Sequence, residues 1–153
     1  MTTPVQDPAG TATPAETVTR FLGALGDRDP EAAVALAAPD VAVTVYPLHV
    51  DATGPAVLRE VLADLVRAFP DLLITVSRVI VTDGGVVTAL FKAEGTQAAD
   101  YAGAINQEKH LDVDQAWRFT VDGGRITSVR AYWCQGQLYR RLAVKRFDEI
   151  AIV

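Results

Sequence analysis

The chain has 153 residues, half of them apolar and 22% charged, which is enough for one folded domain with a sizeable core. Its net charge of -5 and the lack of a Lys/Arg cluster argue against nucleic acid or an anionic membrane as the main partner. A single cysteine, Cys134, excludes an internal disulfide, and the sequence has neither four-ligand zinc spacing nor an apolar run of about 18 residues. We therefore expect a cytoplasmic protein that binds a small molecule and uses no metal or other cofactor.

The first elements in chain order are an irregular arm and a helix. Residues Met1–Ala12 are rich in Thr, Pro and Ala without an apolar period, which predicts a flexible arm, followed by one domain over residues 13–153. Thr13, Pro14 and Glu16 form a typical helix start, and apolar side chains then recur at helical spacing. The pattern predicts an amphipathic helix.

Two more helices and a strand are predicted before the middle of the chain. A short helix over Asp29–Leu36 should be stopped by Pro39, and Val41–Tyr46 reads as a strand. A third helix follows Thr53 and continues to Phe69, where the next residue is a proline.

From there the apolar period changes to two, which is typical of strands. The turns between them are Asp83–Gly85 and Asp122–Gly124, whereas the longest irregular segment, Thr96–Lys109, is a candidate lid. A short helix near Leu138–Leu142 precedes a tail that ends at Val153. The predicted strands are Leu72–Val81, Val86–Gly95, His110–Val121 and Arg125–Cys134.

Helices first and antiparallel hairpins afterwards predict an α+β fold, with the helices on one face of a sheet. A strongly bent sheet would leave a hollow between these layers.

Short sequence segments also show a resemblance to a known family, which covers about Thr13 to Leu142. The segment Gly124–Trp133, GRITSVRAYW, resembles the last long strand of ketosteroid isomerases, and Gln135–Leu138 with Arg140–Leu142 resembles the end of SnoaL-like polyketide cyclases. Both groups belong to the nuclear transport factor 2-like superfamily. The resemblance implies a cone-shaped fold, in which a curved and mostly antiparallel sheet wraps around three N-terminal helices and encloses an apolar pocket.

The catalytic residues of ketosteroid isomerases are replaced at the matching positions. Phe21 stands where the family has an oxyanion-binding tyrosine, and Tyr46, before Pro47, stands where it has the general-base aspartate. A tyrosine is a poor base at neutral pH because its pKa lies near 10. Gln115 matches the protonated aspartate of the oxyanion hole and can still donate a hydrogen bond.

The other catalytic sets of the superfamily are also absent. The aspartate and histidine of SnoaL-type cyclases match Ala131 and Trp117, and the Arg and two Asp of limonene epoxide hydrolases match Phe91, Ala93 and Ala131. The resemblance therefore implies a pocket that lacks the usual acid/base groups.

Alternation along the last strands predicts which side chains face inward. Gln115 belongs to an inward apolar set, where its amide must bond either to a neighbouring element or to a ligand. The opposite side chains, His110, Asp112, Asp114 and Arg118, are predicted on the outer face, which in this superfamily often forms a dimer interface. The inward residues are Leu111, Val113, Gln115, Trp117 and Phe119 on one strand and Thr127, Val129, Ala131 and Trp133 on the next.

Our leading functional hypothesis is a cyclase or isomerase of secondary metabolism that folds an apolar polyketide- or terpenoid-like intermediate for ring closure, including pericyclic closure. Gln115 and Tyr46 would polarise a carbonyl, and the protein would be a homodimer. Two alternatives remain: a binding protein without catalysis, and an acid/base cyclase that uses His110 with Asp112 or Asp114. The predicted pocket lining is Phe21, Phe69, Phe91, Tyr101, Trp117, Ala131 and Trp133.

Overall fold

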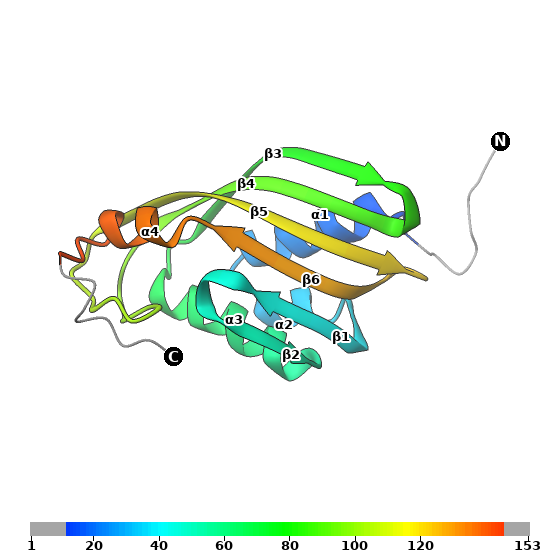
Figure 1. Ribbon diagram of the computed structural model, residues 1–153, viewed down its shortest axis with the longest axis horizontal. Coiled ribbons are helices and arrows are strands. Elements are labelled where there is room, and N and C mark those ends of the chain that lie inside the picture. Colours follow the sequence, from blue (N-terminus) through cyan, green and yellow to red (C-terminus); the bar gives the residue numbers. More distant parts are fainter. Residues whose placement is uncertain (1–11, 146–153) are drawn as a thin grey trace.

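The computed structural model describes residues 12–145, so most of the predicted arm Met1–Ala12 and the predicted tail lie outside the described residues. The described chain is an α+β structure, as the sequence predicted, in which helices pack against one strongly curved sheet (Figure 1). None of its described helices is long and apolar enough to cross a membrane. The helices are α1 (Pro14–Gly26), α2 (Pro30–Val34), α3 (Pro55–Ala68) and α4 (Gln135–Arg141).

The first helix begins at the predicted capping box. The Thr13 hydroxyl accepts a hydrogen bond from the Glu16 amide at 3.2 Å, and the Glu16 carboxylate accepts one from the Thr13 amide at 2.8 Å. The bond from the Thr13 amide to the carboxylate, supported by the Thr13 side chain, lowers the pKa of Glu16. The apolar face of α1 is buried through Val18, Phe21 and Leu25, so local capping and packing place the helix against the sheet.

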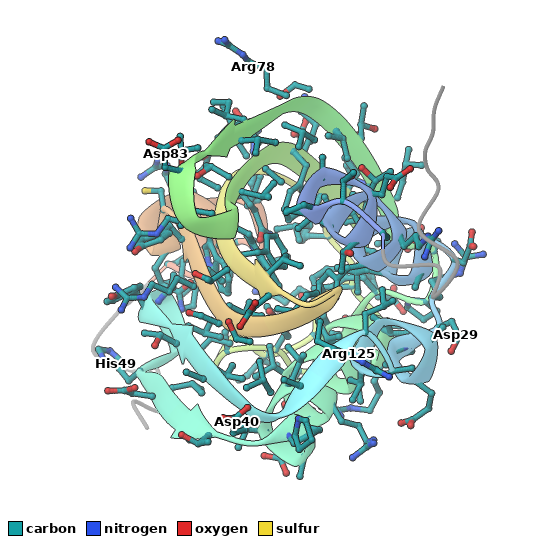
Figure 2. All side chains as sticks on the ribbon, turned by 90° about the vertical axis from the view of Figure 1, so that its right-hand side faces the viewer. Asp29, Asp40, His49, Arg78, Asp83 and Arg125 are labelled. Atoms are coloured by element: carbon teal, nitrogen blue, oxygen red, sulfur yellow. The ribbon has the colours of Figure 1, made fainter. Side chains whose placement is uncertain are left out.

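Six strands form the sheet in the order β2-β1-β6-β5-β4-β3. All neighbouring pairs are antiparallel except β1 with β6, and the two terminal strands, β2 and β3, leave the sheet open along one side. Figure 2 shows the sheet curving around an interior filled by side chains, while labelled charged residues such as Arg78 and Asp83 lie at the periphery. The strands are β1 (Ala37–Val45), β2 (Val50–Thr53), β3 (Leu73–Thr82), β4 (Val86–Thr96), β5 (His110–Asp122) and β6 (Arg125–Trp133).

The sequence prediction was wrong in the region that joins α2 to α3. The strand starts at Ala37, before Pro39, because the pairing register with β6 shifts between Ala37 and Ala42 and this irregularity accommodates a proline that cannot donate to the ladder. Tyr46 does not continue the strand but begins a short 3-10 turn, Tyr46–Leu48. The edge strand β2 was missed because its four residues are mostly exposed and carry no apolar alternation.

A second register shift changes the inward set on β6. The pairing with β5 moves from Thr120↔Ser128 to Val121↔Ile126, which leaves Thr127 as the extra residue of a β-bulge. Ile126 is fully buried and Thr127 only partly, so Thr127 does not belong to the inner face as the strict alternation predicted.

The two predicted hairpin turns are confirmed at Asp83–Gly85 and between Asp122 and Arg125. Gly85 adopts a φ of 75°, and a Cβ atom there would lie 2.2 Å from the Val121 carbonyl oxygen, so glycine is required by both backbone conformation and space. Both turns lie at one end of the sheet, and α4 with the long connection between β4 and β5 lies at the other (Figure 1).

Candidate functional site

Aromatic rings fill the middle of the concave side. Trp117 on β5 lies between Phe91 on β4 and Phe21 on α1, with ring centroids 5.8 Å and 6.2 Å from its own. Phe119 completes the cluster at 5.2 Å from Phe21. All four side chains are at most 3% exposed, so much of the predicted aromatic lining is packed ring against ring.

Gln115 continues the same inner face towards the end of the sheet that carries α4. Its neighbours across the ladder are Phe91 and Trp133, and its side chain is buried among apolar residues. The Trp117 indole nitrogen donates a hydrogen bond to Gln115 Oε1 at 2.7 Å. An indole N–H can only donate, so chemistry requires the amide oxygen to face Trp117 and directs the NH2 group away from it.

No acceptor within residues 12–145 contacts the Gln115 Nε2 atom. In the same part of the chain every fully enclosed side-chain nitrogen or oxygen atom has a hydrogen-bond partner. Gln115 Nε2 is therefore not fully enclosed, and it can donate two hydrogen bonds to a group that reaches it.

The buried polar side chains of the described residues are Thr17, Gln97 and Gln115, and none of them titrates. Tyr101 carries a buried phenol, which is ionisable, but burial raises its pKa well above the usual value of 10. Tyr101 therefore stays protonated at neutral pH and can act as a hydrogen-bond donor but not as a base. Among the described residues no cluster of His, Cys, Asp and Glu could hold a metal ion.

The long connection between β4 and β5 is anchored on both sides of the site. At one side Tyr101 packs edge-on against Phe69 at the end of α3, with 5.5 Å between centroids. At the other, the Tyr139 hydroxyl on α4 donates to the Ala102 carbonyl at 2.6 Å, and Gln107 Nε2 donates to the Leu142 carbonyl at 3.2 Å. The connection and α4 together cover this end of the sheet (Figure 1).

Gln97 holds the connection in shape from within. It is 1% exposed, donates to the carbonyls of Ala99 and Ala104, and accepts from the Gln107 amide at 3.4 Å. Sequence reasoning missed Gln97 and Tyr139, because a glutamine in an irregular segment and a tyrosine in a short helix carry no pattern that predicts burial or contact.

Tyr46 lies away from this interior. It is 47% exposed and stacks on Tyr132 with 4.7 Å between ring centroids. Tyr132 follows the fully buried Ala131 on β6 and therefore points to the outer face. The structure does not bring Tyr46 together with Gln115, so the expected joint polarisation of one carbonyl by these two residues has no geometric support.

The remaining predicted lining residues are placed as follows. Phe69 and Ala131 are fully buried and Tyr101 is nearly so. Trp133 is partly buried, and its indole nitrogen donates to Gln135 Oε1 at 2.8 Å.

The residues proposed for an acid/base cyclase, His110, Asp112 and Asp114, lie on the outer face, as the alternation along the strand predicted. The His110 side chain is 58% exposed and lies 3.7 Å from the Glu94 carboxylate. Asp112 pairs with Lys92 at 3.4 Å, and Asp114 is exposed. These groups cannot act inside the site, so the structure does not support the acid/base alternative there.

The outer face also carries a hollow of about 560 Å³. Leu90, Ala116 and Tyr132, which are direct partners across β4, β5 and β6, form its apolar floor. Ser77 and Asp114 border it, and Phe91, Gln115 and Trp133 of the same strands also contribute.

A strongly curved six-stranded sheet with helices packed on its concave side is the nuclear transport factor 2-like cone fold. Residues 18–129 match the family model of the SnoaL-like domain. The chain therefore belongs to the SnoaL-like domain family. No curated protein matches the sequence at a significant level.

Solved structures support the same fold. The chain is similar to a proposed SnoaL-like polyketide cyclase from Jannaschia sp. CCS1, with a TM-score of 0.77, 18% identity and coverage of 93% of this chain and 100% of that chain. It is also similar to IdmH, a proposed polyketide cyclase from Streptomyces antibioticus, with a TM-score of 0.74, 19% identity and coverage of 87% and 100%. A hypothetical protein with a ketosteroid isomerase-like fold from Catenulispora acidiphila, solved with trimethylamine, matches with a TM-score of 0.73, 20% identity and coverage of 88% and 96%.

Proposed function

We propose that this protein is a cyclase or isomerase of secondary metabolism that holds an apolar polyketide- or terpenoid-like intermediate in the shape required for ring closure. The observation that carries the proposal is the Gln115 amide, whose oxygen is held by Trp117 and whose NH2 group has no protein partner within residues 12–145. The neighbours of Gln115 on the inner face, Phe91, Trp117 and Trp133, are aromatic, so this part of the interior suits an apolar ligand with one polar atom beside the amide.

The mechanism requires little from the protein beyond shape and one hydrogen bond. Walls that hold a flexible chain with its reacting carbons close together remove much of the entropic barrier to ring closure. A carbonyl of the substrate that accepts from Gln115 Nε2 becomes more electrophilic, or becomes a better activating group for a pericyclic closure, without any proton transfer by the enzyme. Tyr101 is a second candidate donor because its phenol is buried and protonated.

Binding without catalysis is the second candidate, and the same interior favours it. The buried polar residues of the described chain include no carboxylate and no histidine that could take a proton from a substrate. A protein with this interior would carry or protect a reactive intermediate equally well. The two candidates differ in whether product forms faster with the protein than without it.

The test uses a panel of linear poly-β-ketone and polyene N-acetylcysteamine thioesters, with products separated by liquid chromatography and identified by mass spectrometry. A cyclase gives cyclic product above the rate in buffer, and Gln115→Leu lowers that rate at least about tenfold, since a donor to developing charge is removed. Thr19→Ala on the exposed side of α1 is the control and should retain the rate. Binding without turnover would favour the second candidate, and full activity in Gln115→Leu would remove the proposed role of the amide.

The proposal includes a homodimer formed through the outer face. Arg118 and Arg130 are direct cross-strand partners there, and within the described residues neither forms an ion pair. Like charges opposite each other are unfavourable unless another charge compensates them. Asp114 lies on the other side of Ala116 along the same strand, so a two-fold axis near Ala116 would place Asp114 of one copy against Arg118 of the other. The apolar floor of the hollow would then be buried at the centre of the interface.

A further inference from the structure

The contact between Trp117 and Gln115 determines which kind of ligand atom the site can accept. The two residues are separated by one position on β5 and point to the same face. Trp117 is 1% exposed and Gln115 is 7% exposed, so the hydrogen bond between them is largely shielded from bulk water. The 2.7 Å bond between Trp117 Nε1 and Gln115 Oε1 is therefore a fixed feature of the interior.

The direction of this bond fixes the direction of the amide. A glutamine amide that turns by half a revolution exchanges an acceptor for a donor at almost the same place. Next to the indole N–H such a turn would bring two donors together and leave both buried without acceptors, which is strongly unfavourable. Trp117 thus holds the NH2 group on the side away from the indole, where Nε2 is accessible, and keeps the amide oxygen away from that side.

We propose that Trp117 is a positioning residue that makes the site select ligands carrying a hydrogen-bond acceptor at this point. This inference rests on the proposed function, because it assumes that a small molecule occupies the space next to Gln115 Nε2. It adds the chemical class of the recognised atom: a carbonyl or ether oxygen is accepted, whereas an apolar group in its place leaves two donors unpaired. In this role Trp117 acts through Gln115 and needs no contact with the ligand.

The experiment compares two probes of similar shape, 2-acetonaphthone with a carbonyl oxygen and 2-isopropenylnaphthalene with a methylene group in its place. Dissociation constants are measured by titration calorimetry for the wild-type protein and for three variants. We expect the wild type to prefer the ketone by about five- to tenfold, the difference made by one hydrogen bond in a buried site. Gln115→Leu should abolish the preference, and Trp117→Phe should reduce it to about twofold, because the amide is then free to turn.

Phe119→Leu is the matched control, since it removes ring packing from the same cluster but no hydrogen bond. It should weaken binding of both probes together and retain the preference for the ketone. If Trp117→Phe also weakens both probes equally and retains the full preference, Trp117 is only a packing residue and the proposal is wrong. If the wild type binds both probes without distinguishing them, the proposal again fails, whereas the proposed binding of a small molecule is supported. If the wild type binds neither probe, the proposed small-molecule function itself is rejected, and this inference with it.

Discussion

The hydrogen bond between Trp117 and Gln115 can be tested in the absence of any ligand by a double-mutant cycle on stability. The variants are Trp117→Phe, Gln115→Leu and the combination. Each single change leaves one buried polar group of the pair without its partner, and the double change removes both.

The expected magnitudes follow from burial. Trp117→Phe loses packing against three rings and leaves Gln115 Oε1 unpaired, which together should lower the free energy of unfolding by about 3 kcal/mol. Gln115→Leu leaves the indole N–H unpaired but buries more apolar surface, so it should cost only about 1 kcal/mol. The double variant leaves neither group unpaired, and its cost should fall short of the sum by about 1 to 2 kcal/mol.

Urea unfolding followed by circular dichroism gives the four free energies, provided that the slope with urea stays constant among the variants. Trp117→Phe combined with Thr75→Ala, on the outer side of β3, serves as a control pair without a shared contact. That pair should be additive to within about 0.5 kcal/mol. Additivity of the same quality in the Trp117–Gln115 cycle would mean that no bond couples the two residues, and it would refute the argument for a fixed amide.

Four further predictions follow from other parts of the molecule. Arg118→Asp should convert the proposed dimer to monomer in sedimentation equilibrium because it faces Asp114 of the second copy, and adding Asp114→Arg in the same chain should restore the dimer. Tyr101 should not titrate near pH 10 in the native protein, so Tyr101→Phe should leave the absorbance change at 295 nm around that pH unaltered. Because the pKa of Tyr101 is raised on folding, its stabilising contribution is complete below pH 10 and is lost as the pH rises further, so Tyr101→Phe should weaken the decrease of stability in that range. Gln97→Leu should speed hydrogen exchange in residues 97–109 by at least about tenfold while the protein stays folded, since three hydrogen bonds are lost. Turnover should be nearly independent of pH between 5 and 8 because no buried polar side chain of the described residues titrates there.

Much of the fold could be predicted because local signals and tertiary packing agree. The capping box at Thr13 predicted the start of α1 to the residue, and the alternation along β5 predicted every inward side chain from Leu111 to Phe119. Two of the failures, at the start of β1 and at Thr127, have the same physical cause. A β-bulge shifts the inner face by one residue, and neither the irregular pairing around Pro39 nor the extra residue Thr127 leaves a trace in a periodic pattern.

The candidate site was predictable only as far as alternation extends. Gln115 could be found because an amide in an apolar row is unusual, and its inward position is confirmed. The hydrogen-bond partner of Gln115 could not be predicted. Trp117 alone is typical of an ordinary core residue, and no sequence pattern indicates that its indole N–H donates to the amide two residues earlier. Tyr46 was expected in the site from the family resemblance, yet the chain turns at that residue and carries the ring to the outer face.

A neutral amide in the place of ionisable groups has a consequence for how such a site can work. A carboxylate or imidazole gains its strength from charge, and its pKa must be tuned by burial and neighbours before it is useful. The Gln115 amide needs no tuning, but its orientation is ambiguous unless a neighbour fixes it. A donor-only partner such as the Trp117 indole resolves that ambiguity with one bond. In this interior, orientation takes the role that pKa adjustment has in an acid/base site, and the chemistry is limited to reactions for which shape and a fixed donor are sufficient.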